Sequence, residues 1–586
     1  MSQAQDDDYS LVLSKAPTAP VTVNLLNDGQ TLFSSEDPRF NADDNTVTFD
    51  STNWDQPITI TLSVNEDYQE QEAQPVQNPP LQPHTLTGIQ GKLIIEGGVP
   101  QGKARALSVA VMLPSESDTE LPVKNIEVSE VLQTDVLNVF NDGSQENDSG
   151  VLSDTSLTGL GMGEGIEYKD LEVVELFLGQ GDDNVVVTDT AADVITVVHG
   201  GGGSDTLSVT GSDADGVLIL FGDTGQNGFA YNATSDEKTD KAREFNNPGN
   251  DIINASGAGG SVTIFGGQGN DVITGSEYGD HIAGGSGNDF IAGLGGDDHI
   301  YGDAGFNVDI STRLDLSTQI LTVVNIADAV NDNLETSDPL TVGSDTINAG
   351  IGDDIVIADK GVINQLDGVN RILSTSLSDV TEVSNVGFTN GGGDTITGST
   401  GNDILLGGQA SDSIYGGNGP EGADIAGNDS DIILGDMGNI LIDTGVVTLI
   451  ATSDTNTGNN DVIHGDEGDD IILAGAGGDY VESGSGNDWV LGDFGEVDLR
   501  NNAIALKTEQ GNSNASGNDE IHLGSGNDSA LGGLGSDTIT SDSGNTHVIA
   551  DNGELNYSGA WNDSAVLVSA LTNDINLGGD DDVTLG

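Results

Sequence analysis

The sequence predicts an all-β protein, most of which is a coiled parallel β-roll. Within residues 456–491 an Asp recurs every nine residues, and an apolar side chain follows it two places later, as in Asp461 and Ile463. Glycines occupy most of the places before each Asp, and the chain has 84 Gly but only 14 Pro among 586 residues. A repeat of this length with Gly-rich turns is typical of a solenoid in which every repeat is a turn followed by a short strand.

The physical chemistry of one repeat explains its composition. Glycines allow the chain to adopt positive φ and to turn its carbonyl groups inward. The Asp supplies a hard anionic oxygen, the kind of ligand that calcium prefers. Two repeats complete one coil, so residues eighteen apart are expected to stack at about 4.8 Å, Asp461 over Asp479 and Asp470 over Asp488. Stacked carboxylates repel each other, so we expect a cation between them.

The pattern resembles the RTX (repeats-in-toxin, hemolysin-type) calcium-binding repeat, G-G-x-G-x-D-x-U-x, where U is apolar. The resemblance implies a calcium-loaded parallel β-roll, in which the Asp carboxylate bridges calcium ions between turns two repeats apart and backbone carbonyls complete the shell. The expected metal-site residues are Asp183, Asp205, Asp251, Asp271, Asp280, Asp289, Asp298, Asp345, Asp354, Asp394, Asp403, Asp412, Asp431, Asp461, Asp470, Asp479, Asp488, Asp519, Asp528 and Asp537, with Gly267, Gly269, Gly285, Gly287, Gly475, Gly477, Gly484 and Gly486.

The repeats come in blocks of about 57 residues within 261–586, which we interpret as the RTX β-roll. Each block ends in nearly the same phrase: GDAG at 302, ADKG at 358, GDMG at 435, GDFG at 492 and ADNG at 550. After it comes an excursion of alternating apolar and polar residues, such as NILIDTGVVTLIAT, which predicts a hairpin or a replaced strand. These insertions either decorate the roll or clamp its coils, and a weakened last repeat carries Asp574.

The residues before the roll predict other β structure. Residues 1–68 alternate as antiparallel strands, and the phrase PVTVNL…VTFDSTNWDQPITITLSVNED resembles the Calx-beta module, a β-sandwich. Residues 69–83 are a Gln/Pro linker, residues 84–165 a small β module, and residues 166–260 an irregular entrance to the solenoid.

Composition excludes several classes of function. With 97 acidic and 15 basic residues the net charge is −82, which excludes generic binding to nucleic acids or anionic membranes. The chain has no Cys, so it has no disulfide framework, and no apolar run is long enough to span a membrane. The first ten residues lack a signal peptide, which favours either export through a distal C-terminal signal or a piece of a larger protein.

Other chemistry finds little support in the sequence. His281 and His299 are eighteen apart and should stack on an outer face; we interpret them as solvent-facing strand residues rather than as a transition-metal site. Trp489 and Phe290 occupy the same outward place. No H-E-x-x-H or G-x-S-x-G motif is present, so we expect no enzyme activity.

The expected function is calcium binding by a structural segment of a large bacterial protein, secreted or at the cell surface. The resemblance implies type I secretion and folding on extracellular calcium into a rigid rod. The high negative charge independently supports a coupling of folding to calcium binding, because bound ions neutralise the repulsion between carboxylates. Two alternatives stay open: an adhesin that binds carbohydrate or protein ligands, and the calcium-binding carrier region of a toxin or hydrolase whose catalytic part lies elsewhere. Self-association of the chain into a fibre or matrix is a further expected interaction.

Overall fold

The protein consists almost entirely of β-strands. The computed structural model describes residues 7–25, 31–42, 44–64, 84–97, 135–223, 247–308, 318–321, 338, 340–366, 369, 372–386, 391–419, 429–453, 458–500, 503–508, 517–559, 565–573 and 579–586. Besides strands, this part of the chain contains two short 3-10 helices, η1 (Leu86–Gly88) and η4 (Leu377–Asp379). No helix in it has the length and apolar character needed to cross a membrane. The predicted all-β class is confirmed.

The chain divides into two compact units. The first comprises Met1–Ile252 together with residues 257–260 and 309–316, and the second comprises the remaining residues up to Gly586. Strand β17 (Ile252–Asn254) falls at the division.

The first unit begins with two three-stranded antiparallel sheets. One contains β1 (Asp7–Leu11), β6 (Ile58–Val64) and β3 (Thr31–Ser34), and the other contains β2 (Val21–Asn24), β5 (Thr46–Phe49) and β4 (Phe40–Asn41). Alternate side chains of β5 and β6 are buried, among them Phe49 and Ile60. The likeness to a Calx-beta module stays a prediction.

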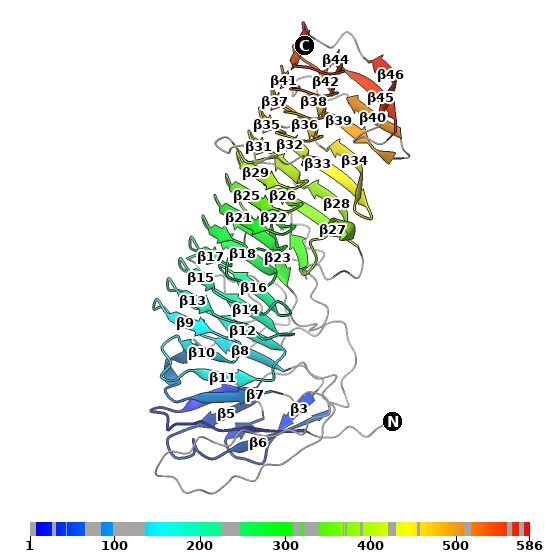
Figure 1. The fold of residues 1–586 in the computed structure, drawn as a ribbon. Helices are drawn as coiled ribbons and strands as arrows, with labels where there is room; N and C mark the ends of the chain where they lie inside the picture. Colours follow the sequence, from blue (N-terminus) through cyan, green and yellow to red (C-terminus); the bar gives the residue numbers. More distant parts are fainter. Residues whose placement is uncertain are drawn as a thin grey trace, which may run out of the picture. The chain divides into compact units, whose positions relative to one another are not determined.

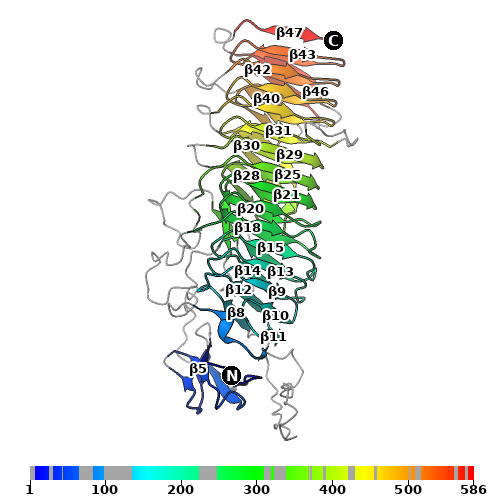
Figure 2. The same cartoon turned by 90° about the vertical axis from the view of Figure 1, so that its left-hand side faces the viewer.

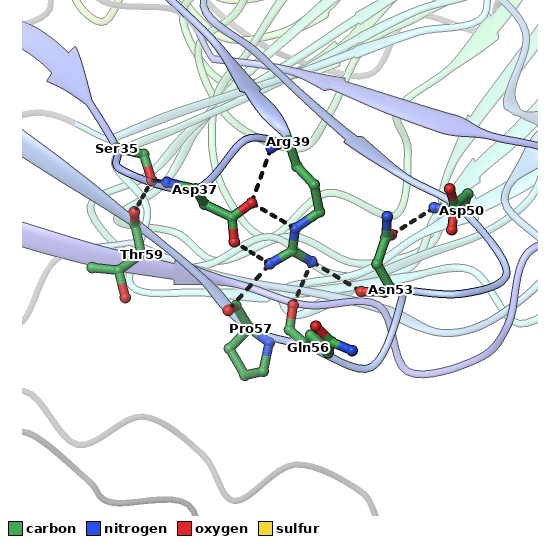
Figure 3. Close-up of polar contacts among 8 residues, drawn as sticks. All are labelled: Ser35, Asp37, Arg39, Asp50, Asn53, Gln56, Pro57 and Thr59. Atoms are coloured by element: carbon green, nitrogen blue, oxygen red, sulfur yellow. Dashed lines mark hydrogen bonds and ion pairs between the residues drawn. The ribbon is translucent and has the colours of Figure 1, made fainter.

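Arg39 ties together the loops of this module (Figure 3). Its Nε and Nη2 donate to the two carboxylate oxygens of Asp37 at 2.9 and 2.6 Å, and its Nη1 donates to the carbonyls of Asn53 and Gln56 at 2.9 and 2.6 Å. The guanidinium carbon also lies 5.1 Å from the ring centroid of Phe49. One planar fork of donors thus links the loop before β4 to the connection between β5 and β6.

Parallel coils follow in the first unit. One parallel sheet has β8 (Val136–Phe140), β12 (Val173–Phe177), β14 (Ile195–His199) and β16 (Val217–Phe221); another has β9 (Ser149–Leu152), β13 (Asn184–Val187) and β15 (Thr206–Val209). The coils have a period of 22 residues, since Phe177 pairs with His199 and His199 with Phe221. Their rings stack with centroids 4.5 and 4.8 Å apart.

The expected small module over residues 84–165 is not separate in the described residues. Its strands β8 and β9 hydrogen-bond in parallel with β12 and β13, and β7 (Leu93–Glu96) pairs in parallel with β11 (Ile166–Lys169). Strand β10 (Ser156–Gly159) runs antiparallel between β9 and β11. Coils that lack the nine-residue period escape a search for repeats, although backbone pairing builds them in the same way.

The second unit contains two parallel sheets, one from each half of every coil (Figure 2). We call the first the inner sheet: β18 (Val262–Gln268), β20 (His281–Ser286), β22 (His299–Tyr301), β26 (Ile355–Ile357), β30 (Ile404–Gly408), β32 (Ile432–Asp436), β36 (Ile471–Leu473), β38 (Trp489–Leu491), β42 (Ser529–Gly533) and β44 (His547–Asp551). We call the second the outer sheet: β19 (Val272–Thr274), β21 (Phe290–Gly295), β25 (Thr346–Ile351), β29 (Thr395–Thr400), β31 (Ser413–Tyr415), β35 (Val462–His464), β37 (Tyr480–Glu482), β41 (Glu520–His522), β43 (Thr538–Ser541) and β47 (Asp582–Leu585).

The excursions form a third sheet in the second unit, the covering sheet. Each excursion after the first supplies one antiparallel hairpin to it, and successive hairpins pair edge to edge along one side of the coils (Figure 1). Its strands are β27 (Gly361–Gln365), β28 (Val380–Asn385), β33 (Gly438–Asp443), β34 (Val446–Thr452), β39 (Gly495–Asp498), β40 (Ala503–Thr508), β45 (Gly553–Ser558) and β46 (Val566–Thr572). The first excursion forms a separate hairpin, β23 (Gly305–Val308) with β24 (Thr318–Leu321). These insertions are therefore hairpins rather than replaced strands.

The covering sheet buries the inner sheet from outside. Trp489 on β38 stacks against Tyr557 on β45, with ring centroids 5.4 Å apart, and Ser529 on β42 shares a 2.5 Å hydrogen bond with the Tyr557 hydroxyl. All three residues of β36 and of β38 are consequently buried, whereas Tyr480 and Glu482 on β37 of the outer sheet are not.

Candidate calcium sites

Two ladders of aspartates lie at the turns between the inner and outer sheets of the second unit. In each ladder the backbone N–H of one Asp donates to Oδ1 of the Asp in the next coil, as from Asp461 to Asp479 at 2.9 Å and from Asp470 to Asp488 at 3.1 Å. The first ladder contains Asp271, Asp289, Asp345, Asp394, Asp412, Asp461, Asp479, Asp519 and Asp537. The second contains Asp280, Asp298, Asp354, Asp403, Asp431, Asp470, Asp488 and Asp528. In the first unit, Asp183, Asp205 and Asp251 follow the same rule.

The ladders continue across the excursions. The backbone N–H of Asp289 donates to Oδ1 of Asp345, and that of Asp298 donates to Oδ1 of Asp354, both at 2.7 Å, although the residues of each pair are 56 apart in the sequence. The expected offset of eighteen residues therefore holds where two consecutive repeats are uninterrupted. An insertion leaves the stacking unchanged, as also from Asp403 to Asp431, which are 28 residues apart.

Most of these carboxylates keep one buried oxygen without a hydrogen-bond partner. A buried, unpaired carboxylate oxygen is costly unless a cation compensates it. Oδ2 is such an atom in Asp205, Asp289, Asp298, Asp345, Asp354, Asp394, Asp403, Asp412, Asp461, Asp470, Asp479, Asp519, Asp528 and Asp537. Among the exceptions, Asp488 Oδ2 accepts from the Ser483 hydroxyl at 2.6 Å, and Asp280 Oδ2 accepts from the amide of Ser276 at 2.5 Å.

Glycines bring carbonyl oxygens to the same places. A Cβ atom on Gly465 would lie 2.6 Å from Asp470 Oδ2 and 2.6 Å from the carbonyl oxygen of Ser483 in the next coil. A carboxylate and a carbonyl from neighbouring coils therefore converge where only glycine leaves room. All eight glycines expected in the turns adopt φ between 96° and 157°: Gly267, Gly269, Gly285, Gly287, Gly475, Gly477, Gly484 and Gly486.

This donor set suits calcium. Carboxylate and carbonyl oxygens are the ligands that the ion takes in flexible geometries. In the described part of the chain, no three His, Asp or Glu side chains converge to hold a metal by themselves, so an ion between two turns would also require backbone carbonyls.

Burial raises the pKa of the ladder aspartates. Desolvation, with added repulsion from Asp436 and Asp479, raises the pKa of Asp461 to about 10. Burial and the neighbouring Asp271 raise the pKa of Asp289 to about 8. Without a cation, the folded chain therefore holds protons on carboxyls that would be ionised in water at neutral pH.

The sequence matches the model of the RTX calcium-binding nonapeptide repeat over residues 246–277, 274–309, 341–362, 388–420, 455–490 and 514–548. The chain carries RTX calcium-binding repeats. RTX repeats bind calcium ions at multiple sites, and the matched segments contain every Asp of the two ladders except Asp431. No curated protein matches the chain. Which Asp and Gly residues ligate each ion stays a prediction.

Sequence reasoning missed further ladder positions. The backbone N–H of Asp537 donates to Oδ1 of Asp581 at 3.0 Å, so Asp581 occupies the ladder position of the last repeat. The sequence pattern points to Asp574 for that repeat, and Asp574 lies outside the described residues. Asp148 donates to Asp183 at 2.7 Å and begins the run in the first unit. The phrase GGDDDVTLG contains the signal for Asp581, because Val583 follows it two places later.

The structure corrects two expectations about outward side chains. His281 and His299 stack as predicted, with ring centroids 4.8 Å apart, but they are 5% and 1% exposed rather than solvent-facing. Residues 372–375 cover them, and the Ser374 carbonyl lies 3.2 Å from His281 Nε2. Trp489 is likewise 2% exposed under the covering sheet, whereas Phe290 on the outer sheet is 47% exposed.

Proposed function

We propose that this chain is a structural segment of a secreted or cell-surface protein, and that calcium outside the cell drives its folding. The observation that carries the proposal is the pair of buried Asp ladders, whose free oxygens need a cation before the coils can stack at neutral pH. Type I secretion suits such a chain, because it stays unfolded while calcium is scarce. We assign it no catalytic role of its own.

The charge of the whole chain supports the same proposal. A net charge of −82 opposes compaction, and ions bound between coils both neutralise carboxylates and link neighbouring turns. We expect affinities of about 10⁻⁴ to 10⁻³ M, the range of extracellular calcium modules.

Circular dichroism of the purified chain tests the proposal. In excess chelator we expect little β signal, and millimolar calcium should produce a strong β spectrum with a cooperative melt, while magnesium at the same concentration should not. A full β spectrum with cooperative melting in chelator would contradict calcium-driven folding.

A second candidate function is adhesion, with the outer sheet as the binding face. Its open surface carries a row of rings from neighbouring strands, in which Tyr415 stacks on His464 at 5.0 Å and Tyr480 lies 5.4 Å from His522. Rings presented on a flat face can stack on sugars. A glycan array probed in calcium tests this: binding that Tyr480→Ala abolishes supports adhesion, and uniform absence of binding contradicts it.

A further inference from the structure

The phrase that closes each block places an aspartate at the same point of every interrupted turn. We call Asp303, Asp359, Asp436, Asp493 and Asp551 the block-closing aspartates; none belongs to the two ladders. In an uninterrupted turn after an inner strand this place is held by a glycine with positive φ, as at Gly475 with φ 109°. None of the block-closing aspartates has positive φ, because the chain leaves the roll there to form an excursion.

The carboxylate of Asp359 spans the interruption. Its Oδ1 accepts from the amide of Gly392, where the chain re-enters the roll, at 2.9 Å. Its Oδ2 accepts from the amide of Gln409 in the next coil. Asp303 makes the first of these contacts with the amide of Gly343 at 2.7 Å.

The second of these contacts, with the next coil, recurs in two later blocks, where Oδ1 of Asp436 and of Asp493 is buried without a hydrogen-bond partner. Asp436 Oδ2 accepts from the amide of Ala476, and Asp493 Oδ2 accepts from the amide of Leu534. Ala476 and Leu534 occupy in the next coil the place that Gln409 occupies after Asp359.

Each of these carboxylates lies against the proposed calcium ligands. Asp436 is 1% exposed; its charge acts on Asp461 of the first ladder, and the charge of Asp479 acts on Asp436. Asp493 acts in the same way on Asp519. Substitution of a block-closing aspartate therefore changes the electrostatic environment of the neighbouring ladder carboxylates.

We propose that four block-closing aspartates, Asp303, Asp359, Asp436 and Asp493, are positioning residues. Each hydrogen-bonds the start of an excursion to its returning end, to the next coil or to both, so that the interrupted turn still presents a calcium site to its neighbours. An insertion of this length would otherwise let the ends of the turn separate, at an entropic cost that the charge-assisted hydrogen bonds of these carboxylates offset in part. The proposal rests on calcium binding by the repeats. It explains why hairpins can be inserted while both ladders continue.

The test uses the full chain refolded in calcium, with Asp436→Ala, Asp436→Asn and the control Asp443→Asn, which removes an exposed carboxylate of β33. Hydrogen exchange should show the Ala476 amide exchanging about ten- to a hundredfold faster in Asp436→Ala, since a buried charge-assisted bond is lost. Asn keeps one acceptor oxygen, so its rate should fall between wild type and Ala. Calcium bound at saturation should fall in Asp436→Ala by the ions next to that turn, and stay at the wild-type number in the control.

Three results would overturn the positioning role: unchanged exchange at Ala476 in Asp436→Ala, an Asn variant as severe as Ala, or an undiminished calcium number. The outcome is separable from that of calcium-driven folding. If the wild-type chain folds without calcium, the function proposed above fails, yet the exchange comparison at Ala476 still decides whether Asp436 fastens the turn. If Asp436→Ala does not fold, Asp436→Asn supplies the same comparison.

Discussion

A buried aspartate between two coils is stable only when its charge is compensated. Asp412 and Asp461 illustrate this, because each offers Oδ1 to a backbone amide and keeps Oδ2 buried without a partner. Burial raises the pKa of both carboxyls to about 10. Either a proton or a cation must therefore accompany each of them in the folded chain.

Removing one ladder carboxylate should weaken calcium binding. Asp479→Asn keeps the Oδ1 acceptor for the amide of Asp461 but loses the charge beside Oδ2. We expect the calcium concentration at the midpoint of folding to rise severalfold, as measured by circular dichroism during a calcium titration. Asp443→Asn is the matched control, and equal midpoints for the two variants would count against Asp479 as a ligand.

Without calcium, stability should depend on pH in the direction set by the raised pKa values. A carboxyl whose folded pKa exceeds the unfolded value of about 3.9 favours folding in acid, and this contribution disappears as the pH rises through the folded pKa. The folded values of about 6 for Asp537, 8 for Asp289 and 10 for Asp298 set the window. In calcium-free buffer we expect the β signal to weaken from pH 5 to pH 9; a signal that strengthens over this range would contradict the account.

At the scale of elements, the two parallel sheets differ because the covering sheet protects only one of them. Several inner strands are apolar at every place, as in Ile355–Ile357 and Ile471–Leu473, whereas outer strands such as Tyr480–Glu482 are apolar only in the middle. This difference is readable in the sequence and indicates that one sheet is buried on both faces. The hairpins that bury it all leave from turns after inner strands, so they emerge on the same side and pair.

The contact between the covering and inner sheets should be measurable through Trp489. Tyr557→Ala removes the ring that stacks on Trp489 and the hydroxyl bonded to Ser529. We expect a red shift of the Trp489 emission in calcium, and a loss of about 3 kcal/mol in the free energy of unfolding, as for large-to-small core changes. Tyr480→Ala removes an equal side chain from the open face of the outer sheet and should leave the emission and the free energy of unfolding near the wild-type values. The same effect in both variants would contradict the contact between the covering sheet and Trp489.

For the whole molecule, repulsion and missing ligands are distinct obstacles to folding. Monovalent salt at high concentration screens a net charge of −82 but does not occupy the buried positions beside the ladder oxygens.

Sodium chloride should therefore compact the chain without folding it. We expect 1 M sodium chloride to reduce the radius of gyration in chelator only in part, as measured by small-angle scattering, and to leave the β spectrum absent. Millimolar calcium should produce both full compaction and the β spectrum. A β spectrum induced by sodium chloride alone would show that screening suffices and that the ladders need no ligand.

The nine-residue period by itself determined the strand in each repeat, the turn glycines, and the stacking of Asp461 on Asp479, because backbone sterics and a two-repeat coil leave little choice. The tertiary structure decided the rest. Asp289 meets Asp345 across an excursion because the register of hydrogen bonds between coils, and not separation along the chain, selects the partner. The covering sheet buries Trp489 because hairpins far apart in sequence pair with one another, and no local pattern encodes those pairings.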